Sequence, residues 1–321
     1  MELNTQFPEH GPEWSDKPPS LAAILLRCEG AYADNTLRGY ASDLHAFRTW
    51  CSERALTWLP AEPETVAAFI DHEIDTLSAS TLKRRLAAIN FAHRMADLSS
   101  PTTRSVVHLA LRRAARRHSR RPNQATGLSS EILTRIVERL PDTLPGLRDA
   151  ALISVGYDTL CRSSELAMMT VAHLRLSGGD TGSLLVPRSK GDQAADGRIA
   201  WLSPRTVGYL QLWLQAAAIV EGPLFRSLHL ARVSEEPLNT SSIRRLVKRA
   251  AKTAGVAADV GKALSGHSMR VGAAQDMLVA GFDALAIMQA GGWKTTTVLL
   301  RYVEHASTKT LHDRRWAALS A

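Results

Sequence analysis

Apolar side chains recur every three or four positions through the first third of the chain, which is the spacing of amphipathic helices. This spacing is found over 36–50, 64–75 and 81–93. The first helix can be capped by Asn35 or Thr36 and the third by Ser80, because short polar side chains accept backbone N–H groups there. No strand-like alternation occurs in this region. Residues 20–115 are therefore predicted to form a small all-α domain of four or five helices.

The pattern after residue 128 is also mostly helical, but it includes two short strand-like runs. The runs 183–187 and 198–202 flank the turn-rich stretch 191–197, which predicts an antiparallel hairpin with a loose tip. Helices are expected at 129–140, 146–159, 204–220, 241–254, 268–280, 283–290, 296–304 and 308–319. The predicted fold class is mainly α with one small antiparallel sheet.

Residues 116–127 separate the two predicted domains and have the composition of a linker. The segment is basic and polar, and it is broken by Pro122 and Gly127. Residues 1–19 hold four prolines but no cationic start and no apolar core, so a disordered tail is expected rather than a signal peptide. The expected organisation is tail 1–19, all-α domain 20–115, basic linker 116–127 and second domain 128–321.

The chain is strongly basic, with a formal net charge of +8 and a pI near 9.7. A polyanion is the default partner of such a chain. Seven arginines and no acidic residue lie between positions 101 and 130, so positive charge is concentrated around the linker. A solvated charge run is the ordinary explanation of such a stretch. The rest of the chain favours contact with DNA phosphates.

The three cysteines, Cys28, Cys51 and Cys161, are an odd number without the spacing of a metal site. This usage indicates free thiols in a reducing compartment. The chain has no apolar run of 18 residues, so no transmembrane helix and no membrane partner are expected. A cytoplasmic protein is predicted.

Candidate chemistry begins with His267 and Arg270, which lie three positions apart at the predicted start of a helix. Their side chains would share one face beside backbone N–H groups that can bind phosphate. Taken alone, such a pair more often belongs to an ordinary surface helix. Tyr302 lies among apolar residues of a later helix, where a tyrosine is usually part of the core.

Two further charged groups could belong to the same site. Arg162 and Glu165 lie one helical turn apart, so the carboxylate can orient the guanidinium, although a plain surface salt bridge is the ordinary alternative. Lys190 lies at the predicted hairpin tip, where a flexible ammonium can reach a leaving oxygen. Most hairpin lysines are only solvated. Each of these signals is weak without the others.

In this order and spacing, the residues resemble the tyrosine recombinase (phage integrase) family. The resemblance is strongest in two motifs, 265–277, which contains His267 and Arg270, and 287–293, which ends in Gly-Gly-Trp293. Shorter matches lie at 36–38, 50–51 and 60–63. The resemblance covers about residues 20–315.

The resemblance implies that Tyr302 attacks the scissile DNA phosphate, forming a 3′-phosphotyrosyl bond and freeing a 5′-hydroxyl. Arg162 and Arg270 would hold the non-bridging oxygens and stabilise the charge that develops on them. Lys190 would be the general acid for the leaving 5′-oxygen, and His267 would assist proton transfer.

Trp293 and Glu165 would complete this site. Trp293 would donate its indole N–H to the phosphate, and it cannot act as an acid or a base. Most family members carry His at this position, and Trp is shared with one branch of the family. Glu165 would be a supporting residue. No metal and no cofactor are expected, because two arginines and a helix terminus would replace the cations of two-metal nucleases. The covalent intermediate would also make ATP unnecessary for rejoining.

The implied partner is a double-stranded DNA recombination site, with one domain on each side of the duplex. Basic residues expected to contact it are Arg38, Lys83, Arg84, Arg85, Arg116, Arg117, Arg120, Arg121, Arg244, Arg245 and Lys248. The last three lie on the basic side of the predicted helix 241–254, whose opposite side is apolar. A solvated helix face is the ordinary alternative.

The resemblance also implies a homo-tetramer on two DNA sites, assembled through the C-terminal helix. This helix would dock into a neighbouring protomer through an apolar stripe formed by Leu311, Trp316, Ala317 and Leu319. The alternative is that the helix packs on its own domain. Accessory proteins are not identified by the sequence.

Three other functions compete with site-specific recombination. A catalytically silent DNA-binding relative would not need the complete catalytic set. A tyrosine-type topoisomerase or telomere resolvase would use similar chemistry in a different assembly. A serine or cysteine hydrolase is disfavoured, because the chain has no G-x-S-x-G motif.

Overall fold

The structure is a computed structural model that describes residues 19–117, 124–176, 180–186, 197–229, 232–306 and 309–319, without the side chains of 309, 310 and 314. The chain divides into two compact units, Met1–Pro122 and Asn123–Ala321. Several expected features lie outside the described residues. They are the tail before residue 19, the hairpin tip with Lys190, and the linker arginines Arg120 and Arg121.

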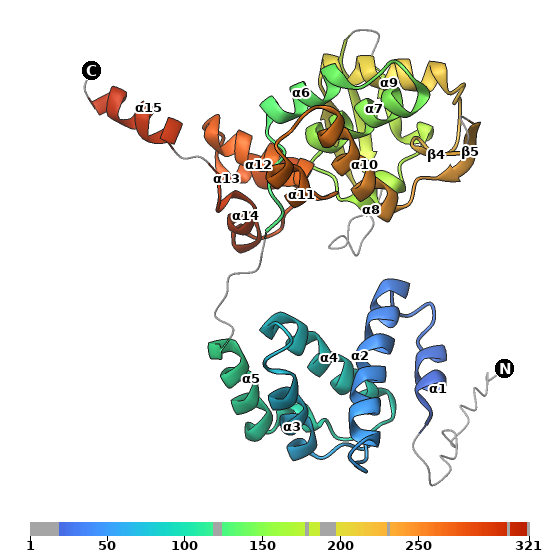
Figure 1. The fold of residues 1–321 in the computed structure, drawn as a ribbon, viewed down its shortest axis with the longest axis vertical. Helices are drawn as coiled ribbons and strands as arrows, with labels where there is room; N and C mark the ends of the chain where they lie inside the picture. The colour runs from blue at the N-terminus through green and yellow to red at the C-terminus, as the bar shows by residue number, and fades with distance from the viewer. Residues whose placement is uncertain are drawn as a thin grey trace, which may run out of the picture. The chain divides into compact units, whose positions relative to one another are not determined.

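The described part of the first unit is built of helices (Figure 1). In chain order they are α1 (Leu21–Leu26), α2 (Asp34–Ser52), α3 (Pro63–Glu73), α4 (Ala79–Met95), the 3-10 helix η1 (Pro101–Thr103) and α5 (Ser105–Arg117). Their apolar stripes meet in one core that includes Phe47, Phe69 and Phe91. The centroids of the Phe47 and Phe69 rings lie 5.0 Å apart. The prediction of an all-α N-terminal domain is confirmed.

Two helix starts in this unit differ from the sequence prediction. α2 begins at Asp34, so Asn35 and Thr36 lie inside the helix rather than at its cap. α4 is capped by the hydroxyl of Ser78 rather than by Ser80. The N-cap of α2 is Ala33, which makes no side-chain hydrogen bond, so no polar residue marks this start. At α4, Ser78 and Ser80 are both suitable caps, and the sequence does not show which of them leaves the helical conformation.

The second unit places a buried helix, α7, at the centre of a mostly helical domain (Figure 1). Its elements in chain order are α6 (Ser130–Arg139), α7 (Leu144–Asp158), α8 (Ser163–Ala167), η2 (Val171–His173), β1 (Leu174–Leu176), β2 (Gly182–Val186), β3 (Arg198–Leu202), α9 (Pro204–Ala216), β4 (Arg226–His229), β5 (Arg232–Pro237), α10 (Thr240–Thr253), α11 (Ala258–Ala263), α12 (Ser268–Val279), α13 (Ala284–Gly291), α14 (Thr296–Val303) and α15 (Lys309–Leu319). α7 packs on α6, α9 and α12, which explains why its residues are apolar or small on nearly every face. The predicted mainly helical fold is confirmed.

The predicted hairpin belongs to a three-stranded antiparallel sheet in the order β1–β2–β3. Leu184 pairs with Ala200 and both are buried, whereas Leu185 and Ile199 form the next pair and face outward. The prediction of a single sheet was incomplete, because β4 and β5 form a second, two-stranded sheet. β5 is mostly exposed and shows little apolar alternation, so its sequence gives little indication of a strand.

A smaller apolar core holds the last helices of the domain together. It joins Ala274 of α12, Ile287 of α13 and Leu299 of α14 to Leu160, which follows α7. α12 and α14 pack directly on each other around these side chains. This packing brings Tyr302 of α14 close to the residues at the start of α12.

Candidate active site

Five of the residues singled out from the sequence meet in the second unit. Arg162 precedes α8, His267 and Arg270 lie at the start of α12, Trp293 follows α13, and Tyr302 lies near the end of α14. Each side chain therefore comes from the end of a helix or from a turn, and the packing of α7, α12, α13 and α14 brings them together.

The side chain of Tyr302 lies at the centre of this cluster. Its hydroxyl oxygen is 2.7 Å from Nε2 of His267. The guanidinium carbon of Arg270 lies 5.3 Å from the centroid of the Tyr302 ring and 4.2 Å from that of Trp293. The rings of Trp293 and Tyr302 have their centroids 4.8 Å apart. The phenol is thus in contact with an imidazole, a guanidinium and an indole.

Three N–H donors of this cluster are buried without a hydrogen-bond partner among the described residues. They are Nε and one terminal nitrogen of Arg270, and Nε1 of Trp293. The other terminal nitrogen of Arg270 donates to the carbonyl of Leu160. A buried donor left unpaired destabilises a protein by about 1–3 kcal/mol, so such donors normally have an acceptor. An anionic oxygen beside Tyr302 would provide one, and a guanidinium binds such oxygens strongly.

The position of Arg270 depends on an unusual backbone conformation at Leu160. This residue has a φ of 50°, in the left-handed region that side chains other than glycine rarely adopt. The turn directs the carbonyl of Leu160 toward the fully buried Arg270. Backbone strain of this kind persists only where the surrounding structure enforces it.

The two glycines before Trp293 explain how the indole reaches the cluster. Gly292 ends α13 with a φ of 67°, a conformation in which glycine has no steric penalty. A Cβ atom on Gly291 would overlap the six-membered part of the Trp293 ring. The indole therefore lies directly on the backbone of Gly291, and any larger residue would displace it.

Glu165 orients Arg162, but in a different arrangement from the expected pair on one helix. Arg162 is the residue before α8, and the Glu165 carboxylate accepts from its backbone N–H at 2.9 Å and from its guanidinium at 2.5 Å. The Glu165 side chain is 4% exposed and that of Arg162 is 27% exposed. The buried carboxylate thus holds a guanidinium that still reaches the surface of the site.

The electrostatics of the cluster favour a neutral imidazole. Burial lowers the pKa of His267 below its usual 6.5, and the positive charges of Arg270 and Arg162 lower it further, against an opposing effect of Glu165. Burial and Arg162 also lower the pKa of Arg270, but an arginine remains charged at physiological pH. With its proton on Nδ1, the neutral ring presents Nε2 as an acceptor to the Tyr302 hydroxyl.

The structure also shows residues at the site that the sequence reasoning missed. Arg198, the first residue of β3, donates to the carbonyls of Thr159 at 2.5 Å and Ala290 at 2.9 Å. It therefore connects the segment before Arg162 to the segment before Trp293. Two glutamines, described below, bind the backbone of Tyr302. An arginine or glutamine of this kind gives no signal in a sequence, because its partners are backbone atoms distant in the chain.

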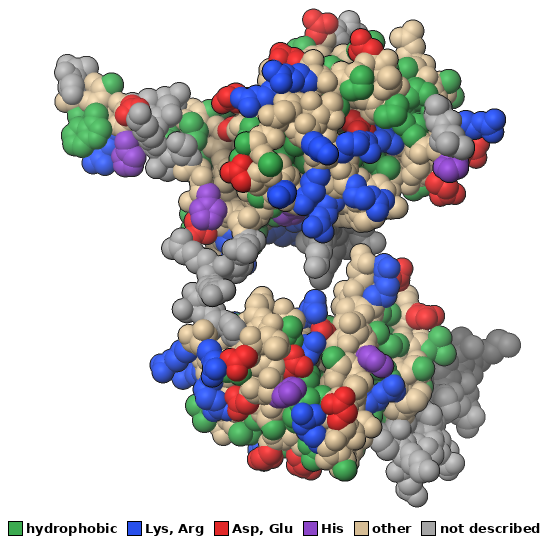
Figure 2. All heavy atoms as spheres, viewed as in Figure 1, with side chains coloured by type: hydrophobic (Ala, Val, Ile, Leu, Met, Phe, Trp, Pro, Cys, Tyr) green, Lys and Arg blue, Asp and Glu red, His purple; other side chains and the backbone are tan. Residues whose placement is uncertain are grey.

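The basic face expected on 241–254 lies on α10. Ile243, Leu246 and Val247 are buried, whereas Arg244 and Arg245 are exposed. Figure 2 shows Lys and Arg side chains gathered over α10 on the visible face of the second unit. Lys248 is partly buried and donates to the carbonyl of Lys262 at 2.8 Å. The exposed Arg244 and Arg245, rather than Lys248, form the accessible part of this face.

The basic residues expected to contact DNA from the first unit differ in their surroundings. Lys83 and Arg38 are exposed. Arg84 makes two hydrogen bonds to the buried Asp43, at 2.8 and 2.9 Å. Arg85 is only 16% exposed and forms ion pairs with Asp43 and Glu73. Arg85 thus supports the packing of the unit.

α5 contains two of the arginines that the sequence placed in the linker. Arg116 and Arg117 lie in its last turn and are exposed, so the linker begins later than residue 116. Arg117 pairs with Asp75 at 2.6 Å, an exposed interaction that contributes little to stability.

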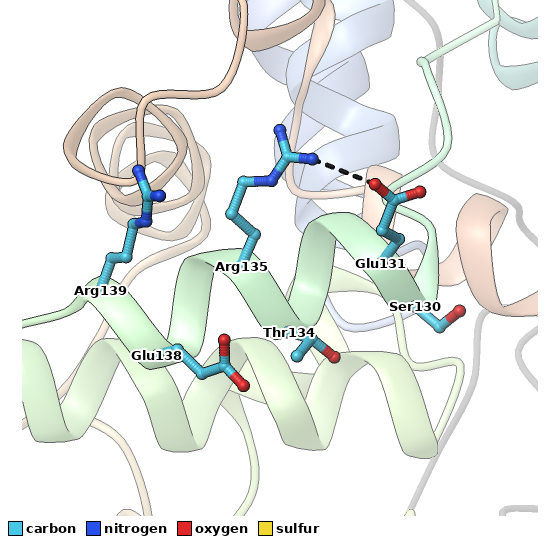
Figure 3. A pocket seen from close by; sticks show the side chains of 6 residues that line it. All are labelled: Ser130, Glu131, Thr134, Arg135, Glu138 and Arg139. Atoms are coloured by element: carbon cyan, nitrogen blue, oxygen red, sulfur yellow. Dashed lines mark hydrogen bonds and ion pairs between the residues drawn. The ribbon is translucent and has the colours of Figure 1, made fainter.

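A pocket of about 480 Å³ lies apart from this cluster, along α6 (Figure 3). It is lined by Ser130, Glu131, Thr134, Arg135, Glu138 and Arg139. Glu131 and Arg135 pair across one turn of the helix at 3.0 Å. None of the lining residues belongs to the Tyr302 cluster, and their charges are either paired or directed to solvent or backbone.

Other expected features can be examined in the part of the chain that the structure describes. Cys28, Cys51 and Cys161 are buried free thiols. No group of three His, Cys, Asp or Glu residues within the described ranges could hold a metal ion. No helix among these residues is both long enough and apolar enough to cross a membrane.

Comparison with known proteins gives matches over nearly the whole chain. Residues 127–309 match the model of the phage integrase family, and residues 24–97 match that of the phage integrase N-terminal SAM-like domain. An integrase/recombinase XerD homolog from Selenomonas ruminantium is 30% identical over 292 residues, which cover 88% of this chain and 84% of that protein. The recombinase Cre of Escherichia phage P1 is 25% identical over 303 residues, covering 89% and 88%.

Solved structures with the same fold include two DNA complexes. The post-cleavage complex of the XerH site-specific recombinase with a palindromic difH substrate has a TM-score of 0.64 at 17% identity, covering 94% of this chain and 85% of that one. A lambda integrase dimer bound to a COC′ core site has a TM-score of 0.58 at 19% identity, covering 90% and 78%. At these identities the likeness concerns the fold.

Proposed function

The chain belongs to the phage integrase family and is a tyrosine-type site-specific DNA recombinase, and we propose that it cleaves and rejoins DNA through a 3′-phosphotyrosyl intermediate on Tyr302. The observation that carries this proposal is the group of N–H donors on Arg270 and Trp293 that have no hydrogen-bond partner among the described residues and lie beside the Tyr302 side chain. A scissile phosphate placed there would receive hydrogen bonds from these donors and would lie next to the nucleophile.

The proposed cleavage step transfers one phosphoryl group and two protons. The Tyr302 oxygen forms a bond to phosphorus as its proton passes to Nε2 of His267, which is 2.7 Å away. The bond from phosphorus to the 5′-oxygen breaks, and that oxygen takes a proton from Lys190. Rejoining reverses these steps with a 5′-hydroxyl of the partner strand. The phosphodiester energy is kept in the covalent intermediate, so the reaction requires neither hydrolysis nor ATP.

Arg162 and Arg270 would stabilise the transition state, in which negative charge increases on the non-bridging oxygens. Arg162 is held by Glu165, and Arg270 is held by the carbonyl of Leu160, so both guanidiniums are oriented before DNA binds. Preorganised donors of this kind account for much of enzymatic rate enhancement. No metal or nucleotide takes part in the proposed step.

The proposed substrate is a double-stranded DNA recombination site that both units contact. Arg244 and Arg245 on α10, and Lys83 and Arg38 in the first unit, are exposed cations suited to phosphate contacts. Arg120, Arg121 and Lys190 are proposed to contact the DNA from segments outside the described residues. We place the enzyme in the cytoplasm with the nucleoid, where its substrate would be.

The proposed assembly is a tetramer on two sites, joined through α15. Trp316 and Leu319 on this helix are 63% and 66% exposed, so they are not packed into a core of their own domain. A mostly apolar pocket of about 500 Å³ includes Trp201, Met277 and Phe282, and the rings of Trp201 and Phe282 are exposed. α15 of one protomer is proposed to cover this pocket on the next.

One experiment tests the chemistry directly. The protein is incubated with plasmid DNA that carries the sequence neighbouring its gene, denatured, and examined by mass spectrometry for a DNA adduct. An adduct on Tyr302 that is lost in Tyr302→Phe, but kept in the control Tyr209→Phe, supports the proposal. Salt-sensitive binding without any adduct would favour the catalytically silent alternative. An adduct accompanied by relaxation of single plasmids, but by no exchange between two sites, would favour a topoisomerase.

A further inference from the structure

The backbone carbonyl of Tyr302 accepts hydrogen bonds from two glutamine side chains. Nε2 of Gln124 lies 3.1 Å from this oxygen, and Nε2 of Gln275 lies 3.2 Å from it. Tyr302 is within the last turn of α14. The final four backbone carbonyls of a helix have no hydrogen-bond partner within the helix. Two side-chain amides therefore satisfy a carbonyl that would otherwise be exposed or unpaired.

The two glutamines come from different parts of the second unit. Gln275 is on α12, the helix that begins with the residues of the phosphate site. Tyr302 is consequently tied to α12 at two points, through its hydroxyl to His267 and through its carbonyl to Gln275. These two contacts fix both the place and the tilt of the side chain relative to Arg270.

Gln124 belongs to the segment before α6, and this segment lies against α12. The backbone N–H of Leu128 donates to the carbonyl of Ser268 at 2.8 Å. A Cβ atom on Gly272 would overlap the backbone of Leu128, and one on Gly127 would overlap the side-chain oxygen of Gln275. The close approach of the two backbones holds Gln124 where it can reach α14.

The amide of Gln124 is not explained by packing alone. Its side-chain oxygen is buried and has no hydrogen-bond partner among the described residues. A buried unpaired acceptor lowers stability, so an apolar side chain of the same length would suit a purely structural role better. What the amide provides, and an apolar chain cannot, is the N–H donated to Tyr302.

We propose that Gln124 and Gln275 are positioning residues, which hold the backbone of Tyr302 so that its hydroxyl meets the scissile phosphate in line with the leaving oxygen. The proposal rests on the proposed function, because it takes Tyr302 as the nucleophile. Neither glutamine touches the DNA in this role. A nucleophile displaced by about 1 Å can slow a reaction by about a hundredfold, so removal of one of two anchors should slow cleavage by roughly tenfold or more.

The test uses the full-length protein with Gln124→Met, Gln275→Met and both changes together. Methionine matches glutamine in length and flexibility but donates no hydrogen bond. Single-turnover cleavage of a nicked DNA site is measured alongside the Kd for that site and the thermal midpoint. Each single variant is expected to cleave roughly tenfold more slowly, with the Kd and the thermal midpoint close to those of the wild type.

A second substrate separates nucleophile positioning from help to the leaving group. When a 5′-sulfur replaces the leaving oxygen, departure no longer needs a general acid, so Lys190→Ala should regain much of its cleavage rate. Gln124→Met and Gln275→Met should remain slow on this substrate. Gln211→Met, a change of an exposed glutamine on α9, is the matched control.

The outcomes distinguish this proposal from the proposed function. Cleavage at the wild-type rate by the double variant would overturn it, and so would a decrease in rate that is matched by weaker binding and a lower thermal midpoint. Recovery of the glutamine variants on the sulfur substrate would also overturn it. If the wild-type protein itself forms no adduct on Tyr302, the proposed function fails instead.

Discussion

Nε2 of His267 lies 2.7 Å from the hydroxyl oxygen of Tyr302. This distance allows proton transfer along the hydrogen bond, and the direction of transfer depends on the charge of the imidazole. Burial and two neighbouring arginines lower the pKa of His267 and so keep the ring neutral. A neutral ring can accept the phenolic proton, whereas a protonated ring could only donate toward the oxygen that must attack.

This relationship predicts the pH dependence of cleavage. The pKa of His267 is lowered in the folded protein, so the acceptor form is present at neutral pH and disappears only as the pH falls through that lowered value. Cleavage measured at subsaturating DNA should therefore stay level from about pH 8 to below the usual histidine pKa of about 6.5, and then decline. Single-turnover rates from pH 5 to 8 check this.

The matched variants for this prediction are His267→Asn and His305→Asn. The first should lower the rate by roughly a hundredfold and remove the decline, because the group that titrates is gone. The second changes an exposed histidine just beyond α14 and should leave the profile as it is. If the cleavage rate of His267→Asn still declines at low pH as the wild-type rate does, a group other than His267 causes the decline.

Removing the indole donor tests the phosphate site. Trp293→Phe keeps an aromatic ring against Arg270 and Tyr302 but removes the unpaired buried N–H. Removal of one preorganised donor slows catalysis by about 100-fold to 1,000-fold in well-studied cases, so a decrease of at least about tenfold in single-turnover cleavage is expected. Trp58→Phe in the first unit is the control and should cleave normally.

Acid should destabilise the first unit through a buried histidine. Nε2 of His93 accepts from the backbone N–H of Ala61 at 2.9 Å, and Nδ1 donates to the carbonyl of Ile89 at 2.8 Å. The contact with Ala61 requires the neutral ring, because a protonated imidazole has no acceptor nitrogen. Burial lowers the pKa of His93 in the folded state below the unfolded value of about 6.5. The unfolded chain therefore binds the proton more readily, and stability should fall as the pH drops below that value.

Thermal melting between pH 5 and 8 measures this effect. The midpoint should decrease on the acid side of about pH 6.5, and His93→Asn should lower the midpoint at neutral pH while reducing its dependence on acid. His72→Asn changes an exposed histidine and should melt like the wild type. If the thermal midpoint of His93→Asn falls with decreasing pH as steeply as that of the wild type, a group other than His93 causes the sensitivity to acid.

The basic face of α10 predicts a change in salt dependence. Arg244→Ala and Arg245→Ala should each weaken binding to all DNA sequences. Each should reduce the slope of log K against log salt by about 0.9 for every phosphate that is no longer neutralised. Fluorescence anisotropy at several salt concentrations measures both quantities. Arg205→Ala, on the exposed side of α9, is the control. Unchanged slopes in the α10 variants would remove this helix from the proposed interface.

Regular elements were largely predictable because local chemistry determines them. α10 has an uninterrupted apolar stripe and an Asn239 cap, and α6 begins with a Ser129 cap, so both helices lie within a residue of their predicted limits. The order of the chemical motifs was also visible, since each is a short local sequence. β4 and β5 were missed because neither of these short strands shows an alternation of apolar and polar residues.

The contacts that hold the side chains of the candidate site in place could not be predicted, because they join residues far apart in the sequence to backbone atoms. The sequence offers no sign that Leu160 turns its carbonyl toward Arg270, or that Arg198 joins two segments across the domain. Gln124 appeared only as part of a polar linker. Such contacts depend on how helices pack, and a glutamine or an arginine looks the same in a sequence whether it is solvated or bound.

The C-terminal helix gives the last prediction, which separates binding from assembly. Deleting residues 308–321 removes α15 with its exposed Trp316 and Leu319 but leaves the Tyr302 cluster intact. Binding to a single site should be unchanged, whereas joining of two sites and recombination should be abolished, because the proposed tetramer depends on this helix. Native gel mobility with one and two DNA sites, together with a recombination assay, measures these steps.

Point variants test the role of α15 without shortening the chain. Trp316→Ala combined with Leu319→Ala removes the apolar side chains and keeps a helix of the same length, so it should reproduce the deletion. His312→Ala combined with Asp313→Ala alters exposed polar positions of α15 and should recombine normally. Because both apolar side chains are exposed in the single chain, their removal should leave the thermal midpoint unchanged. Normal recombination by the apolar double variant would mean that protomers associate through another surface.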